Sequence, residues 1–132
     1  MIALGDVHTG VFTNSDELYS DLHAASTAEH DLIWRMPLHE GYLKQINKAP
    51  MDLCNTGGRP AGSCTAALFL KRFVDGLIVD GTDNEDQSDL IKWAHIDIAG
   101  TMSLTSGDGG YNHAGMTGRA TRVLIEYLRR AA

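Results

Sequence analysis

The segment KWAHIDIAG, residues 92–100, carries the clearest backbone pattern in this sequence. Successive side chains of a β-strand point to opposite faces of its sheet, so a period of two in the residue types predicts a strand. One face carries Ala94, Ile96 and Ile98, and the other carries Trp93, His95 and Asp97. We expect this strand to lie in the interior of a β-sheet.

Helical patterns lie before and after that strand in the chain. Residues 16–28 follow the capping residue Ser15 and begin with two acidic residues, which is typical of a helix N-terminus. Residues 62–74 are apolar nearly all round in their first turns and predict a buried helix. A short helix is expected at residues 41–47. The closing helix, at residues 120–130, is expected to turn four side chains inward: Val123, Leu124, Tyr127 and Leu128.

Three other segments are expected to be extended. Residues 2–12 mix β-forming residues with glycines, and residues 32–38 form a short extended segment that Pro37 ends. Residues 51–55 are a candidate strand. Strands that alternate with helices predict a layered α/β fold. The length of 132 residues predicts one domain or a piece of one.

Charge and composition exclude several classes of partner. Eleven Lys and Arg against 17 Asp and Glu give a net charge of −6, which the phosphates of a nucleic acid would repel. The apolar runs are far shorter than the roughly 20 residues that cross a bilayer, so we expect no membrane partner. Residues 76–91 are expected to form an acidic surface insertion, and they lack the glycine and glutamate of a calcium loop. Cys54 and Cys64 are the only cysteines; we expect reduced thiols and a cytoplasmic location.

Six histidines raise the question of a metal site, but none forms an HExxH motif. The best local pair is His95 with Asp97, which are two residues apart and therefore on the same strand face. A histidine that hydrogen-bonds to a neighbouring carboxylate is the commoner arrangement, and we prefer that interpretation. The apolar surroundings of Cys64 favour a buried, inert thiol over a catalytic one.

The segment NTGGRPAGS, residues 55–63, is the most informative one for a binding site. Its paired glycines permit close approach of another backbone, and the helix that begins near Gly62 or Ser63 presents unpaired N–H groups. We expect a ligand or a tightly packed neighbour there. The segment lacks the lysine and the spacing of a Walker loop, so a substrate-side loop and a structural turn both stay open.

Several longer motifs occur in order along the chain: GVFTN at 10–14, WRMPL at 34–38, GGRPAG at 57–62, TAA at 65–67, WAHIDIAGT at 93–101 and GMTGR at 115–119. Together they resemble the C-terminal part of the catalytic domain of the leucyl (cytosol) aminopeptidase family. The resemblance covers residues 2–128, and the acidic residues within 76–91 look like an insertion. It implies an α/β fold with a mixed β-sheet flanked by helices, in which residues 1–132 are a single partial domain.

The resemblance also implies an activity, the removal of N-terminal residues from peptides at a site with two divalent metals, zinc or manganese. Such metals polarise the scissile carbonyl and generate a hydroxide nucleophile. In the family, the metal ligands and the catalytic arginine lie upstream of the part that matches here, and no segment of this sequence matches the NTDAEGR signature. We therefore assign no catalytic residue and no metal ligand, and expect no cofactor in this chain and no activity from it alone.

What the resemblance carries over is part of the pocket for the side chain of the substrate's N-terminal residue. The matching positions are Thr56, Ala99 and Met102. A small residue at position 99 leaves room, and Met102 offers a polarisable apolar surface, which together suit an aliphatic side chain. The alternative interpretation of Met102 is a residue of the core.

Loss of the upstream strands would expose a sheet edge and an apolar face, which costs stability. We therefore expect an N-terminal companion segment or self-association to cover them. The family resemblance also implies a homo-oligomer, since full-length members of the family form hexamers. The alternative function is a stand-alone, non-catalytic binding module, for example a lectin-like, inhibitory or assembly protein that reuses the scaffold. A third interpretation is a small metal enzyme that uses His95, Asp97 and His113.

Overall fold

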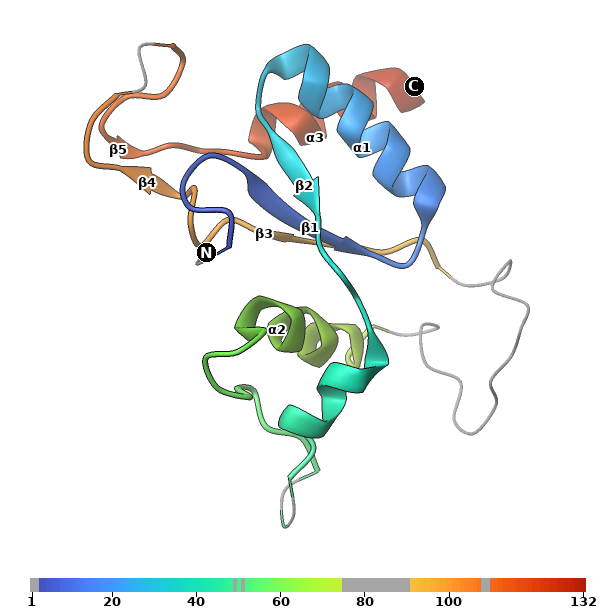
Figure 1. Cartoon of the computed structure of the whole chain (residues 1–132). Coiled ribbons are helices and arrows are strands. Elements are labelled where there is room, and N and C mark those ends of the chain that lie inside the picture. The colour runs from blue at the N-terminus through green and yellow to red at the C-terminus, as the bar shows by residue number, and fades with distance from the viewer. Residues whose placement is uncertain (1–2, 49, 51, 75–90, 108–109) are drawn as a thin grey trace.

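The computed structural model describes residues 3–48, 50, 52–74, 91–107 and 110–132. The acidic insertion predicted at residues 76–91 lies outside the described residues, except for its last residue. In chain order the elements are β1 (Thr9–Thr13), α1 (Asp16–Glu29), β2 (Ile33–Arg35), the 3₁₀ helix η1 (Glu40–Gln45), α2 (Gly62–Lys71), β3 (Ala94–Asp97), β4 (Ser103–Leu104), β5 (Gly115–Met116) and α3 (Thr121–Ala131). Figure 1 shows their arrangement.

The larger sheet has three strands in the order β2-β1-β3. The central strand β1 is parallel to β2 and antiparallel to β3, so the sheet is mixed, as predicted. Every residue of β1 is buried, because the strand has a neighbour on each edge and helices over both faces. The short strands β4 and β5 form a separate antiparallel pair beyond the end of β3.

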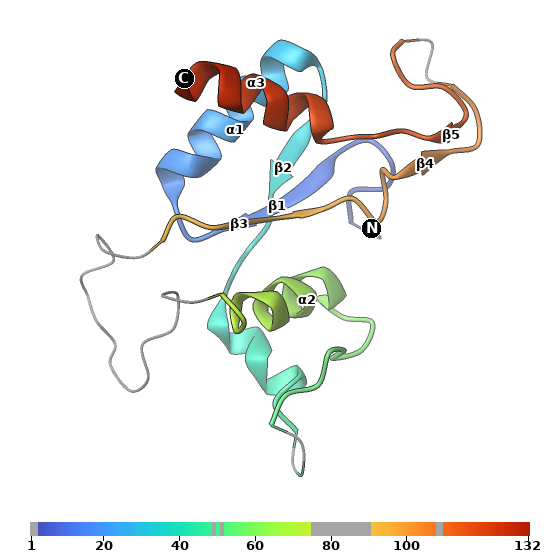
Figure 2. The ribbon, with the colours of Figure 1, turned by 180° about the vertical axis from the view of Figure 1, so that it is seen from behind.

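Two adjacent residues of β1 divide the core into two clusters. Val11 packs with side chains of α1, β2 and α3, which are Leu22, Ala25, Ile33 and Val123. Phe12 points to the opposite face, as the strand period requires, and packs with Cys64 and Ala67 of α2. Figures 1 and 2 show α1 and α3 on one side of the sheet and α2 with η1 on the other. The molecule is therefore a three-layer α/β fold with helices on both faces.

The helix predicted at residues 16–28 is confirmed as α1. The Ser15 hydroxyl oxygen accepts a hydrogen bond of 3.2 Å from the Leu18 amide, which is the predicted N-terminal cap. The prediction of a buried helix at residues 62–74 holds only in part. α2 ends at Lys71, and Leu70 and Phe73 are exposed, because only one face of the helix packs on the rest of the fold.

Two sequence predictions about strands are wrong. Within the described residues β3 pairs with β1 alone, so it is an edge strand and not an interior one. Alternation reports which face each side chain takes, but it does not report how many strands lie alongside. Residues 52–55 form no strand; the Cys54 amide donates to the Ile46 carbonyl at 2.7 Å and folds that segment back on the end of η1.

The closing helix forms as α3, but only part of its predicted inward face is covered. Val123 is buried and Tyr127 packs against the core beside α1. Leu124 and Leu128 are exposed, because α1 covers only one stripe of the helix. No helix in the described part of the chain has both the length and the apolar character that a membrane span requires.

A buried charged contact, the Asp31 latch, ties three segments together. The fully buried Asp31 carboxylate accepts a hydrogen bond of 2.9 Å from the Ala120 amide through Oδ2, and its Oδ1 lies 3.6 Å from Arg119 Nε. The Nη1 of Arg119 donates to the carbonyls of Asp6 at 2.7 Å and Val7 at 2.8 Å. The latch therefore joins the end of α1, the start of α3 and the loop before β1.

Candidate functional site

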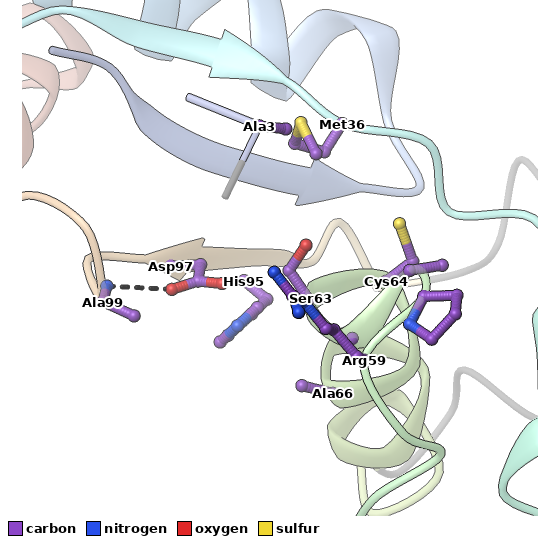
Figure 3. A pocket seen from close by; sticks show the side chains of 12 residues that line it. Ala3, Met36, Arg59, Ser63, Cys64, Ala66, His95, Asp97 and Ala99 are labelled. Carbon is purple, nitrogen blue, oxygen red and sulfur yellow. Dashed lines mark hydrogen bonds between the residues drawn. The ribbon is translucent and has the colours of Figure 1, made fainter. Parts of the chain in front are cut away.

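An open pocket of about 850 Å³ lies between α2 and the α2-facing side of the sheet. Figure 3 shows the side chains around it. The lining residues come from four places in the chain: Ala3 before β1; Met36 after β2; Arg59, Pro60, Ala61, Gly62, Ser63, Cys64 and Ala66 at the start of α2; and His95, Asp97 and Ala99 in and after β3.

The strand period explains why two polar side chains of β3 line this pocket. Ala94 and Ile96 pack on the cluster beneath α1 and α3, as the alternation predicts. His95 and Asp97 therefore point to the opposite face, toward α2. On the other wall, Gly62 and Ser63 precede Ala66 by four and three residues, which is the spacing of one helix face. One side of the first turns of α2 therefore faces the pocket.

Burial changes the pKa of one ionisable side chain of β3 in this pocket, His95. The His95 ring stacks on the Trp93 ring with the two centroids 6.4 Å apart, and its centroid lies 5.8 Å from that of the Phe12 ring. Burial lowers the pKa of the His95 imidazole below its ordinary value, and the nearby Asp97 carboxylate offsets part of that shift. Asp97 Oδ1 accepts a hydrogen bond of 2.9 Å from the Ala99 amide, so this carboxylate shapes the turn after β3.

Cys64 contributes a thiol and not a thiolate. Its side chain is buried against Phe12, and burial raises the pKa of the thiol above its ordinary value. A raised pKa leaves little thiolate at neutral pH, which agrees with the prediction of an inert thiol. The chemistry that the pocket offers is therefore binding: a surface of small side chains and two sulfur-containing residues, with Arg59, His95 and Asp97 as its charged or ionisable groups.

The glycine-rich segment before α2 is held by close packing at one glycine. A Cβ on Gly57 would lie 2.9 Å from Gln45 Cβ and 3.2 Å from Ile46 Cγ2, so this glycine sits against η1. Gly58 has a φ of +109°, a conformation that favours glycine. The tightly packed neighbour expected at this segment is thus the end of η1, while Arg59 to Ser63 reach the pocket.

The three pocket residues predicted from the family resemblance occupy different places. Ala99 is exposed and lines the pocket described above. Met102 is 44% exposed and Thr56 is exposed, and neither is among the described residues that line that pocket. Ala99 and Met102 lie on one turn, residues 98–102, in which the amides of Thr101 and Met102 both donate to the Ile98 carbonyl.

Sequence reasoning did not identify Ala3, Met36 or Ala66 as pocket residues. The helical spacing of residues 62, 63 and 66 places Ala66 on the same helix face as the end of the glycine-rich segment, and this spacing could have identified it. Met36 carried no such signal, because its place depends on the pairing of β1 with β2 and on packing against a helix far along the chain.

Within the described ranges, no three His, Cys, Asp or Glu side chains gather so that they could hold a metal ion. In particular, the structure does not assemble His95, Asp97 and His113 into a metal site. The interpretation of the chain as a small metal enzyme built on those three residues is therefore wrong.

Comparison with known proteins gives one consistent result. The model of the cytosol aminopeptidase family, catalytic domain, matches residues 1–125. The cytosol aminopeptidase of Homo sapiens is 46% identical over 131 residues, which are 98% of this chain and 22% of that protein. The probable cytosol aminopeptidase of Synechococcus sp. (strain WH7803) is 42% identical over 132 residues, 100% of this chain and 24% of that protein.

Solved structures agree in fold as well as in sequence. The bottromycin maturation enzyme BotP in complex with Mn is 32% identical with a TM-score of 0.82, and the match covers 98% of this chain and 26% of that one. The cytosol aminopeptidase from Coxiella burnetii is 35% identical with a TM-score of 0.77 and coverages of 98% and 25%. The chain thus spans about a quarter or less of the length of these relatives.

Proposed function

The chain belongs to the cytosol aminopeptidase family, and from that membership we propose that it acts as one part of a two-metal peptidase that removes N-terminal residues from peptides. The observation that carries the proposal is the coverage. Nearly all of this chain matches its relatives, while only 22% of the human protein is matched. We assign the residues of the chemical step to the part of such a peptidase that has no counterpart here, so this chain alone is inactive.

The role proposed for this chain is to supply part of the wall that receives the side chain of the substrate's N-terminal residue. Thr56, Ala99 and Met102 are the residues that we assign to it. The exposure of Met102 supports a ligand-facing role over a core role, because a core methionine would be covered. The small side chain of Ala99, at the rim of an open pocket, leaves space for an aliphatic group.

The same division of labour applies to the metals. The described residues gather no three His, Cys, Asp or Glu side chains, so by themselves they do not fit a centre of two zinc or manganese ions. We assign these ions to the rest of the peptidase and derive no step of the reaction through them. The pocket and its neutral histidine serve to bind and orient the substrate.

The proposal includes a partner for the exposed surfaces. The outer edge of β3 is open within the described residues, and α3 exposes Leu124, Ile125 and Leu128. Free edges and apolar stripes of this kind favour association. We propose that a companion segment of the same peptidase or a second copy covers them, in a homo-oligomer located in the cytosol, as the names of the relatives suggest.

A segment exchange tests this function. The part of human cytosol aminopeptidase that matches this chain would be replaced by these 132 residues, and hydrolysis of leucine p-nitroanilide would be measured. We expect activity from the chimera and none from the isolated chain with zinc or manganese. Turnover by the isolated chain would overturn the division of labour. A folded, metal-loaded but inactive chimera would instead favour the stand-alone binding module.

Within the chimera, Ala99→Phe tests the pocket. A phenyl group at position 99 should lower kcat/KM for leucine p-nitroanilide by about tenfold or more relative to the alanine substrate, because it fills space that the larger side chain needs. The matched control is Ala114→Phe, at an exposed position outside the described pocket lining. Equal effects of both variants on the ratio would refute the assignment of Ala99.

A further inference from the structure

The turn at residues 98–102 carries two of the three residues assigned to the substrate pocket. Its backbone is fixed by hydrogen bonds from the Thr101 amide at 2.9 Å and the Met102 amide at 2.8 Å, both to the Ile98 carbonyl. The Ala99 amide is held by Asp97 Oδ1. Ala99 and Met102 are themselves exposed, so packing does little to fix their side chains, and their position depends on the backbone of the turn.

The side chain of Thr101 anchors this turn to the centre of the sheet. Thr101 is 1% exposed, and its hydroxyl lies 2.8 Å from the hydroxyl of Thr9, the first residue of β1, which is fully buried. The register that pairs Gly10 with Asp97 brings the start of β1 opposite the end of β3, which explains how residues 92 positions apart meet.

A second anchor comes from the segment after β5. Thr117, just after β5, donates from its hydroxyl to the Thr101 carbonyl at 2.6 Å and from its amide to the Met102 carbonyl at 2.9 Å. Thr101 is therefore bound through its side chain to β1 and through its carbonyl to the segment after β5. Its position relative to both is fixed by directional bonds, of which the hydroxyl pair with Thr9 is buried and the bond from the Thr117 hydroxyl is part-buried.

We propose that Thr101 is a positioning residue: through its buried hydroxyl pair with Thr9 it sets where Ala99 and Met102 stand, and so which side chain the substrate pocket accepts. The inference rests on the proposed function for its claim about the pocket. The physical reason is that a displaced turn would leave the buried Thr9 hydroxyl without its partner and the Thr101 hydroxyl with only its longer bond, 3.5 Å, to the Ile98 carbonyl of the same turn, which is costly, so the turn has one preferred position. A specificity site needs such support, because small displacements of its wall change what it accepts.

The first test uses the whole chain and needs no activity. Thr101→Val keeps the shape and removes the hydroxyl, Thr101→Ser keeps the hydroxyl, and Thr105→Val is the control at a nearby exposed threonine. The readouts are amide hydrogen exchange at Met102 and the chemical shift of its methyl group. We expect exchange about tenfold faster in Thr101→Val, near-normal exchange in Thr101→Ser and no change in the control. Unchanged exchange and shift in Thr101→Val would overturn the inference.

A double variant separates positioning from stability. Thr9→Val with Thr101→Val removes both hydroxyls, so no buried group is left unpaired and the fold should keep its stability. We expect the Met102 amide to exchange fast in the double variant at an unchanged midpoint of global unfolding. Normal exchange at Met102 in the double variant would show that shape alone holds the turn and would overturn the inference.

The second test places the double variant in the chimera with human cytosol aminopeptidase. We expect the ratio of kcat/KM for leucine over alanine p-nitroanilide to fall by about tenfold, at normal metal content. If Ala99→Phe shifts this ratio and the double variant does not, the inference fails while the proposed function stands. If neither shifts the ratio but exchange at Met102 is fast, the proposed pocket fails and Thr101 retains only a structural role, which also overturns the inference.

Discussion

The Asp31 latch offers the sharpest test of how this fold is held together. The Asp31 carboxylate is fully buried, and the side chain of its partner Arg119 is only 10% exposed. Asp31→Ala would leave the guanidinium without its anion and the Ala120 amide without its acceptor. Removing one partner of a buried pair costs about 3–5 kcal/mol, since the remaining charge stays desolvated. Against a typical total of about 5–15 kcal/mol for a domain, that is a large fraction.

A graded series assigns this cost to its sources. Asp31→Asn keeps an oxygen for the Ala120 amide and removes the charge, so its cost should be smaller than that of Asp31→Ala. Arg119→Lys keeps a charge, but its one nitrogen cannot both donate to the Asp6 and Val7 carbonyls, as Nη1 does, and lie beside the Asp31 carboxylate, as Nε does. The double variant Asp31→Leu with Arg119→Met removes both charges and should cost less than Asp31→Ala alone.

The assay is denaturant unfolding of the 132-residue chain, followed by circular dichroism and by tryptophan fluorescence. The two probes should report the same midpoint if the unit unfolds in one step. The reasoning is refuted if Asp31→Ala lowers the unfolding free energy by less than about 1 kcal/mol, which would correspond to an exposed pair. It is also refuted if the double variant is as unstable as Asp31→Ala, because an uncompensated charge would then not be the cause.

Three further predictions follow from single features of the fold and are checked by the same unfolding measurement. Ser15→Ala should cost about 1 kcal/mol, because it removes the cap of α1, whereas Ser20→Ala on the exposed part of that helix should not destabilise it. Gly57→Ala should cost about 1–3 kcal/mol, because its Cβ would press on η1, whereas Gly62→Ala meets nothing within 4 Å and should be neutral or stabilising. Because the pKa of His95 is lowered in the folded chain, the unfolded chain takes up a proton more readily at this residue. The stability that the neutral His95 contributes is complete above about pH 6.5, and it is lost as the pH falls from there toward the folded-state pKa. His95→Phe should therefore flatten the dependence of the unfolding free energy on pH in this range.

The sequence correctly predicts features that depend on residues close together in the chain. It does not predict which strands and helices lie side by side in the fold. Ser15 and the acidic residues after it predicted the start of α1, because a cap acts within one turn. The alternation at residues 94–97 predicted which side chains of β3 share a face. The number of strands beside β3 was predicted wrongly, because a period of two is the same at an edge as in the interior.

The exposed side of α3 shows the same limit. Leu124 and Leu128 have the spacing of an inward-facing stripe, yet of the four predicted side chains Val123 and Tyr127 belong to or pack against the core cluster that α1 shares, and Leu124 and Leu128 are exposed. A helical pattern reports that an apolar stripe exists, but the width that is covered depends on which elements lie against it. The sequence therefore determines that α3 has an apolar stripe, whereas the assembly that we propose determines how much of that stripe is buried.

Alternation along β3 links the fold to the site more directly than any motif does. One face of the strand, Ala94 and Ile96, closes the core beneath α1 and α3, and the other, His95 and Asp97, faces the pocket beside α2. A shift of register by one residue would exchange these faces and place a histidine and a carboxylate in the apolar core. The core therefore fixes the register, the register fixes the end of β3, and the turn that bears Ala99 and Met102 begins there. A substitution that weakens the packing of Ala94 or Ile96 should on this reasoning disturb the pocket as well as the fold.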